Sequence, residues 1–329
     1  MEEGAAFGAC DRRATSVRAG RRDAAEIHQK GPNPETLRGS AHGRCSVTPM
    51  TAPTTFRIGG DPEVRRLGFG AMHLRPGTAE ARAACIAVAR RAVDLGVTLI
   101  DTAHMYGWGA NEDLLAEALH PYPEGLVIAT KVGIRHTASG EGWRHAGDPA
   151  DLRAQVDEAL RRLRLDRIEL LQLHRLDPHV PLPDQLGALR DLREEGKVGR
   201  IGLSEVTVDE LAEARSVVDI AAVQNRYNLL DREHEPVLKA CEAADIAFLP
   251  WRPVAAGESG ARTEIAAVAK EVDATPTQVV LAWLLARSPV ILPIPGTTSV
   301  AHLEENLGAN AVHLTQEQYD RLGRVSAPA

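Results

Sequence analysis

From about Val64 onward, the sequence alternates short apolar runs rich in β-branched residues with longer segments of helical periodicity. Apolar residues recur at helical spacing in residues 82–95 and 151–163, for example. Continuously apolar strands separated by helices are typical of a parallel sheet covered by helices. The candidate strands are residues 67–71, 97–102, 126–131, 168–174, 200–204, 221–224, 247–251 and 290–294.

Eight such strand–helix units in about 260 residues predict an α/β fold of the (β/α)8 TIM-barrel type. The alternative, an open doubly wound sheet, would usually carry a glycine-rich fingerprint directly after its first strand. Here the first strand leads into GFGAMH, which lacks that spacing, so we favour the barrel. Ahead of it, Gly59, Gly60 and Asp61 separate two extended pieces and predict an N-terminal β-hairpin that closes the barrel bottom.

Residues 1–50 differ in composition from the rest of the chain. They combine Gly, Ala, Ser and Arg with scattered acidic residues and have no apolar periodicity. Such a segment buries too little apolar surface to offset the entropy of ordering it, so we expect a disordered extension before a barrel domain at 51–329. A secretory signal lacks its apolar centre here, and the acidic residues argue against a transit peptide. Met50 is a candidate natural start.

Composition excludes several classes of partner. A net charge of −7 gives no basic excess for nucleic acid. No apolar stretch reaches the ~20 residues that a membrane-spanning helix needs. The four cysteines form no C-x-x-C pair, so we expect reduced thiols in a cytoplasmic protein, without a metal site or disulfides. The partner expected is a small molecule, and the sequence sets no oligomeric state.

Four reactive side chains follow the second, third and fourth candidate strands: Asp101, Tyr106, Lys131 and His174. Catalytic groups of a (β/α)8 barrel lie at the carboxyl ends of its strands. Taken singly, a strand-end aspartate often caps a helix, and a lone histidine is more often a satisfied core group. The four together at successive strand ends are much harder to explain structurally. We therefore predict that they form a catalytic site.

Their chemistry suits carbonyl reduction, which requires hydride on carbon and a proton on oxygen. A free tyrosine, with a pKa of about 10, is a poor acid at neutral pH. The Lys131 ammonium is expected to stabilise the phenolate and lower the pKa of Tyr106, while Asp101 holds the lysine. His174 can donate a hydrogen bond to the carbonyl oxygen.

These four residues, in this order, resemble the catalytic tetrad of the aldo-keto reductase family. The resemblance covers about residues 55–325. Its later motifs are EEGKVGRIGLSE, VQNRYN, FLPWRPVAAG and IPGTTSVAHLEEN. Within the family it is strongest to bacterial pyridoxal-reductase-like members, through RRLGFGAMHL, ALHPYPEGLVIATKVG and LAWLLARSP. It implies an oxidoreductase that reduces an aldehyde or ketone with NAD(P)H, with Tyr106 as the proton donor.

The resemblance also implies a cofactor site. Ser204 and Gln224 would hydrogen-bond the nicotinamide carboxamide, and Trp251 would stack on the nicotinamide ring. The helix after the last strand would bind the 2′-phosphate and the adenine. The family's usual lysine and arginine near the 2′-phosphate are replaced by Gly296 and His302, and Glu205 stands where many members have asparagine. We expect NADPH, with NADH as the alternative. The expected cofactor-binding residues are Ser204, Gln224, Trp251, Gly296, Thr297, Thr298, His302, Glu305 and Asn306.

Two other functions compete with this one. A nucleotide-binding barrel with little or no turnover could act as a regulatory or sensor subunit, but the complete tetrad argues against it. A metal-dependent barrel hydrolase needs more histidine and acidic ligands at its strand ends than Asp101 and His174. The loop at 133–148 is expected to form one wall of the substrate pocket. Its Arg135 and Arg144 would attract an anionic carbonyl compound unless they are simply solvated.

Overall fold

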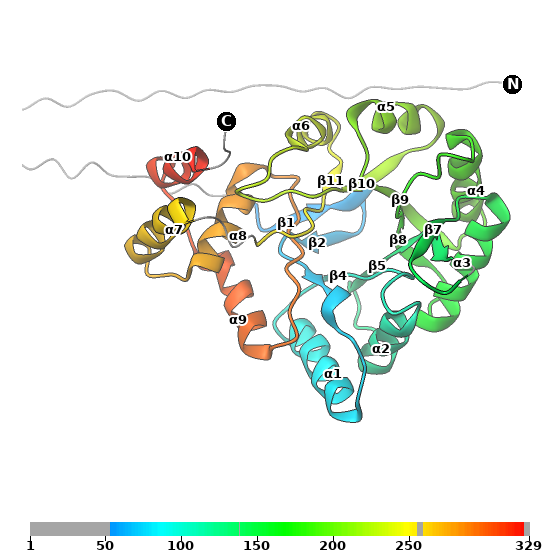
Figure 1. Ribbon diagram of the computed structural model, residues 1–329, viewed down its shortest axis with the longest axis horizontal. Coiled ribbons are helices and arrows are strands. Elements are labelled where there is room, and N and C mark those ends of the chain that lie inside the picture. The colour runs from blue at the N-terminus through cyan, green and yellow to red at the C-terminus, as the bar shows by residue number, and fades with distance from the viewer. Residues whose placement is uncertain (1–52, 138, 255–258, 326–329) are drawn as a thin grey trace, which may run out of the picture. The chain divides into compact units, whose positions relative to one another are not determined.

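The computed structural model describes residues 53–137, 139–254 and 259–325, all within the unit Val47–Ala329. The extension expected at 1–50 lies outside the described residues. Strands and helices alternate through the described part, with the helices outside the sheet (Figure 1). Within these residues no helix is both long and apolar enough to cross a membrane.

Seven parallel strands form one sheet in the order β11-β10-β9-β8-β5-β4-β3. Adjacent strands follow one another in the sequence apart from the hairpin inserted between β5 and β8, as a barrel requires. Each overlaps one of the predicted strands. They are β3 (Phe69–Gly70), β4 (Leu99–Asp101), β5 (Val127–Val132), β8 (Ile168–Leu173), β9 (Val198–Ser204), β10 (Ile220–Gln224) and β11 (Ala247–Phe248).

The eighth predicted strand, 290–294, is an extended segment that closes the sheet into a barrel. On one side it exchanges two main-chain hydrogen bonds with Phe248 of β11. On the other, Gly68 N and Gly70 N donate to Pro293 O and Pro295 O at 2.9 and 3.3 Å. The two prolines have no N–H to return, so the pairing is one-sided and no regular strand forms here. The (β/α)8 barrel is therefore confirmed.

Helices α1 to α10 pack around the sheet, and their starts follow the sequence signals. Asp148 caps α3 by accepting a hydrogen bond from Ala150 N at 2.9 Å, with Pro149 in the first turn. Thr275 makes a capping box at the start of α8. The helices are α1 (Ala79–Asp94), α2 (Ala110–Leu119), α3 (Pro149–Leu163), α4 (Leu182–Glu194), α5 (Val208–Val217), α6 (Glu235–Ala243), α7 (Ser259–Glu271), α8 (Pro276–Arg287), α9 (Val300–Gly308) and α10 (Gln316–Arg324).

The predicted N-terminal hairpin is present. Strands β1 (Thr55–Arg57) and β2 (Glu63–Arg65) pair antiparallel. Their connection contains Gly59 at a φ of 58°, a left-handed conformation that glycine adopts without steric cost. Ile58 and Val64 pack with interior residues of the barrel strands. The hairpin thus closes one end of the barrel with apolar side chains and leaves the other end for chemistry.

Candidate active site

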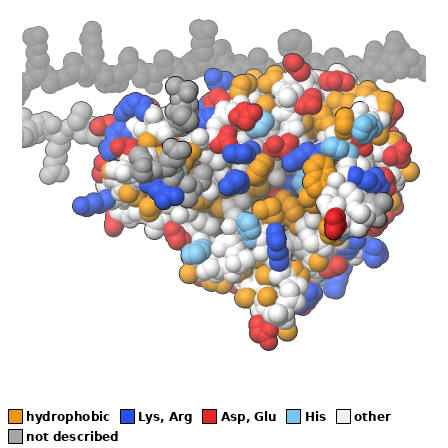
Figure 2. Space-filling view, in the orientation of Figure 1, with side chains coloured by type: hydrophobic (Ala, Val, Ile, Leu, Met, Phe, Trp, Pro, Cys, Tyr) orange, Lys and Arg blue, Asp and Glu red, His pale blue; other side chains and the backbone are white. Residues whose placement is uncertain are grey.

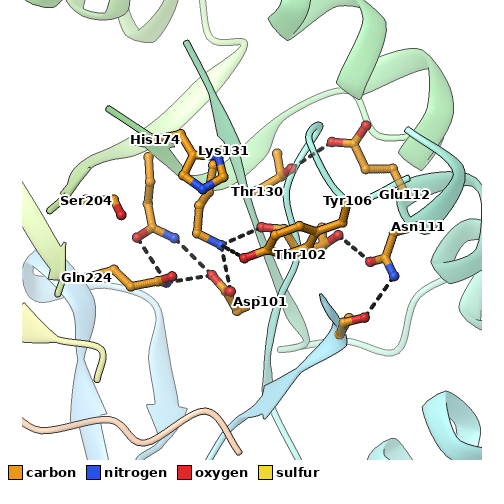
Figure 3. Close-up of polar contacts among 12 residues, drawn as sticks. Asp101, Thr102, Tyr106, Asn111, Glu112, Thr130, Lys131, His174, Ser204 and Gln224 are labelled. Carbon is orange, nitrogen blue, oxygen red and sulfur yellow. Dashed lines mark hydrogen bonds and ion pairs between the residues drawn. The ribbon is translucent and has the colours of Figure 1, made fainter. Parts of the chain in front are cut away.

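The four residues of the predicted tetrad come together where β4, β5 and β8 end (Figure 3). Asp101 is the last residue of β4, Lys131 lies near the end of β5, and His174 directly follows β8. Tyr106 stands in the loop between β4 and α2. Asp101, Lys131 and His174 are buried, whereas the Tyr106 side chain is half-buried. Parallel strands therefore bring residues 73 positions apart, from 101 to 174, into one cluster.

Lys131 is the centre of this cluster. Its ammonium donates to Asp101 Oδ2 at 2.7 Å, to Thr102 O at 2.8 Å and to Tyr106 Oη at 3.4 Å. These three contacts use all three N–H groups of the ammonium. The lysine is therefore fixed between a carboxylate and the tyrosine hydroxyl, as the tetrad hypothesis requires.

Two glutamines complete the surroundings of Asp101. Gln172 Nε2 and Gln224 Nε2 both donate to Asp101 Oδ1, at 3.1 and 2.8 Å. Gln224 was predicted as a carboxamide ligand; here its amide nitrogen supports the tetrad. Gln172 was not predicted. Strand alternation places it on the same face as His174, so a single glutamine among leucines in LLQLH was an available signal.

The charges of the site follow from its burial. Removal from solvent raises the pKa of Tyr106, and the nearby Lys131 opposes this rise without reversing it. Lys131 thus acts on the tyrosine pKa in the expected direction, but burial outweighs it in this arrangement. Burial acts to lower the pKa of Lys131, but Asp101 and Tyr106 outweigh it and the pKa is raised. Burial, then Lys131 and Arg175, hold the pKa of His174 well below its ordinary value. At neutral pH the tyrosine is protonated, the lysine charged and the histidine neutral.

A buried asparagine, not singled out from the sequence, anchors the loop that carries Tyr106. Asn111 Nδ2 donates to Ala71 O and Leu74 O at 2.8 and 2.7 Å, and its Oδ1 accepts from Thr102 Oγ1 at 2.5 Å. These bonds join the start of α2 to the segment after β3. An asparagine near a helix start looks like an ordinary cap in sequence, so nothing there marked its role.

Ser204 and Gln224 lie opposite one another at the ends of β9 and β10, as predicted. Arg175 Nη1 donates to Ser204 Oγ at 3.3 Å and to His174 O at 2.6 Å, linking this pair to the tetrad. Beside them, the Trp251 indole N–H donates to the Glu205 carboxylate. The glutamate that stands in place of the family's usual asparagine thus fixes Trp251 at the strand ends.

The remaining predicted cofactor residues form a second group around the start of α9. Gly296 lies against Gly70 so closely that a Cβ there would come within 2.6 Å of Gly70 O. Ser299 caps α9, Thr298 and His302 are exposed, and Asn306 is buried. Glu305 accepts a hydrogen bond from Thr275 Oγ1 at 2.7 Å, so its carboxylate is tied to the start of α8. This contact fixes α9 against α8, while Ser299 holds the first turn of α9 in place.

A cavity of about 520 Å³ reaches Tyr106. Most of its lining is apolar, and Figure 2 shows hydrophobic side chains interspersed with basic ones over the middle of the molecule. Its lining includes Met72, Leu74, Arg75, Pro76, Met105 and Tyr106.

The 133–148 loop forms an antiparallel hairpin that was not predicted, β6 (Ile134–His136) with β7 (Trp143–His145). His136 stacks on Trp108 of the Tyr106 loop at a centroid distance of 3.5 Å, so the hairpin touches the catalytic loop. Arg135 and Arg144 both form ion pairs with Asp151. Both arginines thus share one carboxylate, and their attraction of an anionic substrate stays a prediction.

The family model described as "Aldo/keto reductase family" matches residues 66–327. The chain belongs to the aldo/keto reductase family. Members of this family are oxidoreductases that use NAD(P)H.

Individual relatives and a solved structure support the assignment to the aldo/keto reductase family. An uncharacterised oxidoreductase of Schizosaccharomyces pombe is 44% identical over 268 residues, 80% of this chain and 87% of that protein. Pyridoxine 4-dehydrogenase of Escherichia coli is 39% identical over 83% of this chain and 98% of its own length. An aldo-keto reductase of Klebsiella pneumoniae, solved in complex with NADPH, superimposes with a TM-score of 0.75 at 27% identity, covering 85% of this chain and 97% of that one. The resemblance to pyridoxal-reductase-like bacterial members is thus confirmed.

Proposed function

We propose that this chain reduces an aldehyde or ketone to an alcohol with NADPH, and that Tyr106 is the proton donor. The observation that carries the proposal is the position of the Lys131 ammonium between Asp101 and the Tyr106 hydroxyl, at 2.7 and 3.4 Å. Tyr106 also lines a cavity of about 520 Å³, in which a carbonyl compound would lie. We likewise propose that residues 51–329 form the catalytic domain.

Bound NADPH would supply the hydride. The neutral ring of His174 can donate an N–H hydrogen bond to the substrate oxygen, and its Nδ1 is buried without a partner among the described residues. Tyr106 gives its proton to that oxygen as negative charge develops there. Lys131 stabilises the phenolate left behind, and Asp101 with its two glutamines keeps the ammonium in place.

The chain's residues suit such a cofactor. Ser204, Gln224 and Trp251 would hold the nicotinamide at the strand ends, beside the tetrad. The capped start of α9 would offer main-chain N–H groups to a phosphate of the cofactor. The segment that leads into this helix and its first turn contain Gly296, Thr297, Thr298 and His302. Glu305 and Asn306 would lie near the adenine.

The named relative suggests the first aldehyde to test. Because pyridoxine 4-dehydrogenase of E. coli is a relative over nearly its whole length, we propose pyridoxal as one substrate. The methionines and proline of the cavity suit the apolar face of a flat ring. A panel with pyridoxal, nitrobenzaldehyde and aliphatic aldehydes would rank these substrates.

The decisive variant is Tyr106→Phe. It removes the hydroxyl that is needed only as charge develops on the substrate oxygen, so we expect a ~10²–10⁴-fold fall in turnover. NADPH affinity and the thermal unfolding midpoint should stay near the wild-type values. Steady-state NADPH oxidation with the best aldehyde measures the turnover, and fluorescence titration measures the affinity.

Two outcomes would contradict the proposal. A Tyr106→Phe variant that binds NADPH normally and still reduces the aldehyde at nearly the wild-type rate would remove Tyr106 from its role. A wild-type protein that binds NADPH but turns over no member of the panel would favour the nucleotide-binding regulatory or sensor function instead.

A further inference from the structure

A second cavity, of about 440 Å³, lies on the outer wall of the barrel between α6, α8 and α10. These helices belong to the outer layer (Figure 1), whereas the tetrad lies at the ends of the barrel strands. None of its lining residues belongs to the candidate active site. They include Arg232, Trp283, Arg287, Tyr319, Asp320 and Arg324.

Two donors at this cavity lack an acceptor within the described part of the chain. Trp283 is 1% exposed, and its indole N–H has no hydrogen-bond partner among the described residues. The same holds for Arg232 Nη2, which is also buried. Leaving a buried donor unpaired costs roughly 1–3 kcal/mol, so two such groups in one place call for an explanation.

Ring stacking holds these donors in position. The Arg232 guanidinium lies 4.5 Å from the Trp283 ring centroid. Trp283 in turn stacks on Tyr319 of α10, with centroids 5.7 Å apart and an interplanar angle of 13°. Arg232, Trp283 and Tyr319 come from three separate parts of the chain, so the arrangement depends on the packing of all three.

Two carboxylates, Glu235 and Asp320, also line the cavity, and both have partners. Glu235 accepts from Tyr227 Oη and pairs with Arg287, and Asp320 accepts from Gln316 at 2.8 Å. By contrast, neither Arg232 nor Arg324 forms an ion pair with any residue in the described ranges. Two arginines without an ion-pair partner in those ranges, Arg232 and Arg324, therefore line the cavity beside Trp283.

We propose that this cavity, the α6–α8–α10 site, binds an oxyanion, either a carboxylate or a phosphate group. An oxyanion placed beside Trp283 and Arg232 would accept hydrogen bonds from Trp283 Nε1 and Arg232 Nη2 and so pair both donors. Arg324 is exposed and supplies charge at the open side. A bound oxyanion links α10 to α6 and α8, and so stabilises the C-terminal end of the fold.

The indole N–H of Trp283 reports this binding directly. The chain has four tryptophans, so protein labelled with ¹⁵N-tryptophan gives four indole signals. Inorganic phosphate and acetate are titrated separately against sodium chloride at equal ionic strength. We expect one of them to move the Trp283 signal saturably downfield and to raise the unfolding temperature, because a ligand of the folded state stabilises it. The anion with the lower half-saturation identifies the ligand class.

Matched arginine variants separate a site from general charge effects. Arg324→Gln should weaken half-saturation about tenfold, the loss expected for one charge-assisted contact. Arg57→Gln, an equally exposed arginine on the β1–β2 hairpin, should leave it unchanged. Arg232→Met should abolish the response, while Trp283→Phe assigns the signal. If neither anion moves the Trp283 signal, or if Arg324→Gln and Arg57→Gln behave alike, the proposal is wrong. None of these measurements requires the protein to reduce a carbonyl compound, so they test the anion site separately from the proposed function.

Discussion

Two lysines of this chain show how surroundings decide what one ion pair does. Lys131 and Lys197 each place the ammonium 2.7 Å from an aspartate oxygen. The Lys131–Asp101 side chains are 0% and 3% exposed, whereas those of Lys197–Asp157 are 36% and 57% exposed. Water screens the second pair and is excluded from the first. The stability of the fold therefore depends on both partners of the buried pair, but little on either partner of the surface pair.

We expect Lys131→Met to lower the free energy of unfolding by about 3–5 kcal/mol, because it leaves the Asp101 carboxylate buried without its counter-charge. Lys197→Met is the matched control and should cost at most about 1 kcal/mol. Urea unfolding at neutral pH measures both. Equal losses in the two variants would contradict the assignment of Lys131 as a buried partner. Aldehyde reduction should also fall in Lys131→Met alone.

The sequence predicted the residues of the tetrad, but not the buried side chains that hydrogen-bond to them and to their loop. Asp101, Lys131 and His174 were predictable because an ionisable residue at the end of an apolar strand is unusual. Gln172 and Asn111 are uncharged, and their roles come from partners far along the chain, at Asp101 and Ala71. The raised pKa of Tyr106 was missed for a related reason: burial depends on what packs around the hydroxyl, which sequence spacing does not give.

At the scale of elements, apolar runs predicted the barrel strands, and capping residues predicted where helices such as α3 and α8 begin. The β6–β7 hairpin escaped because its strands, IRH and WRH, carry mostly polar residues and no alternation of apolar and polar positions. They are held by pairing with one another. The 290–294 segment was recognised as a strand by its apolar run, but Pro293 within it and Pro295 directly after it limit it to an extended, one-sided pairing.

Helix α9 gives the test of cofactor choice. His302 is exposed in its first turn, where the family's usual arginine would meet the 2′-phosphate. We expect the wild-type protein to prefer NADPH to NADH. His302→Arg should raise that preference about tenfold, because a guanidinium is always charged and can hold a phosphate with two hydrogen bonds. The measurement is the ratio of kcat/KM for the two cofactors. His313→Arg, at another exposed site, should leave the ratio unchanged; an unchanged ratio in His302→Arg would argue against this placement of the phosphate.

At the scale of the whole barrel, one buried arginine joins the first strand to the last. Arg66 is 1% exposed and donates to the main-chain carbonyls of Ile291, Leu285, Ser288 and Pro53. Burial lowers the pKa of Arg66 to about 10, so it stays charged at neutral pH. Its fork of donors fits several carbonyls at once, which no other side chain does as well.

Replacing Arg66 should therefore weaken the entire fold. Arg66→Met leaves several buried carbonyls without a donor, and we expect a loss of at least ~3 kcal/mol in the free energy of unfolding. The neighbouring Arg65, the last residue of β2, is exposed, and Arg65→Met should have little effect. Chemical denaturation followed by circular dichroism compares the two. Similar midpoints for both variants would show that Arg66 does not hold the closure together.

The closing segment also leaves the ribosome long after Arg66, to which it is bonded in the folded protein. Ile291 is synthesised 225 residues after Arg66, and at ordinary translation speeds this delay lasts about 10–45 seconds. Throughout that time β3 has an open edge, and β11 has one as well once its residues have been made; open edges are sites of pairing between chains. A nascent chain stopped before residue 291 would carry every residue of the candidate tetrad, yet it would expose two unsealed edges and tend to aggregate. Newly made protein thus depends on being shielded from its neighbours until the closing segment has emerged.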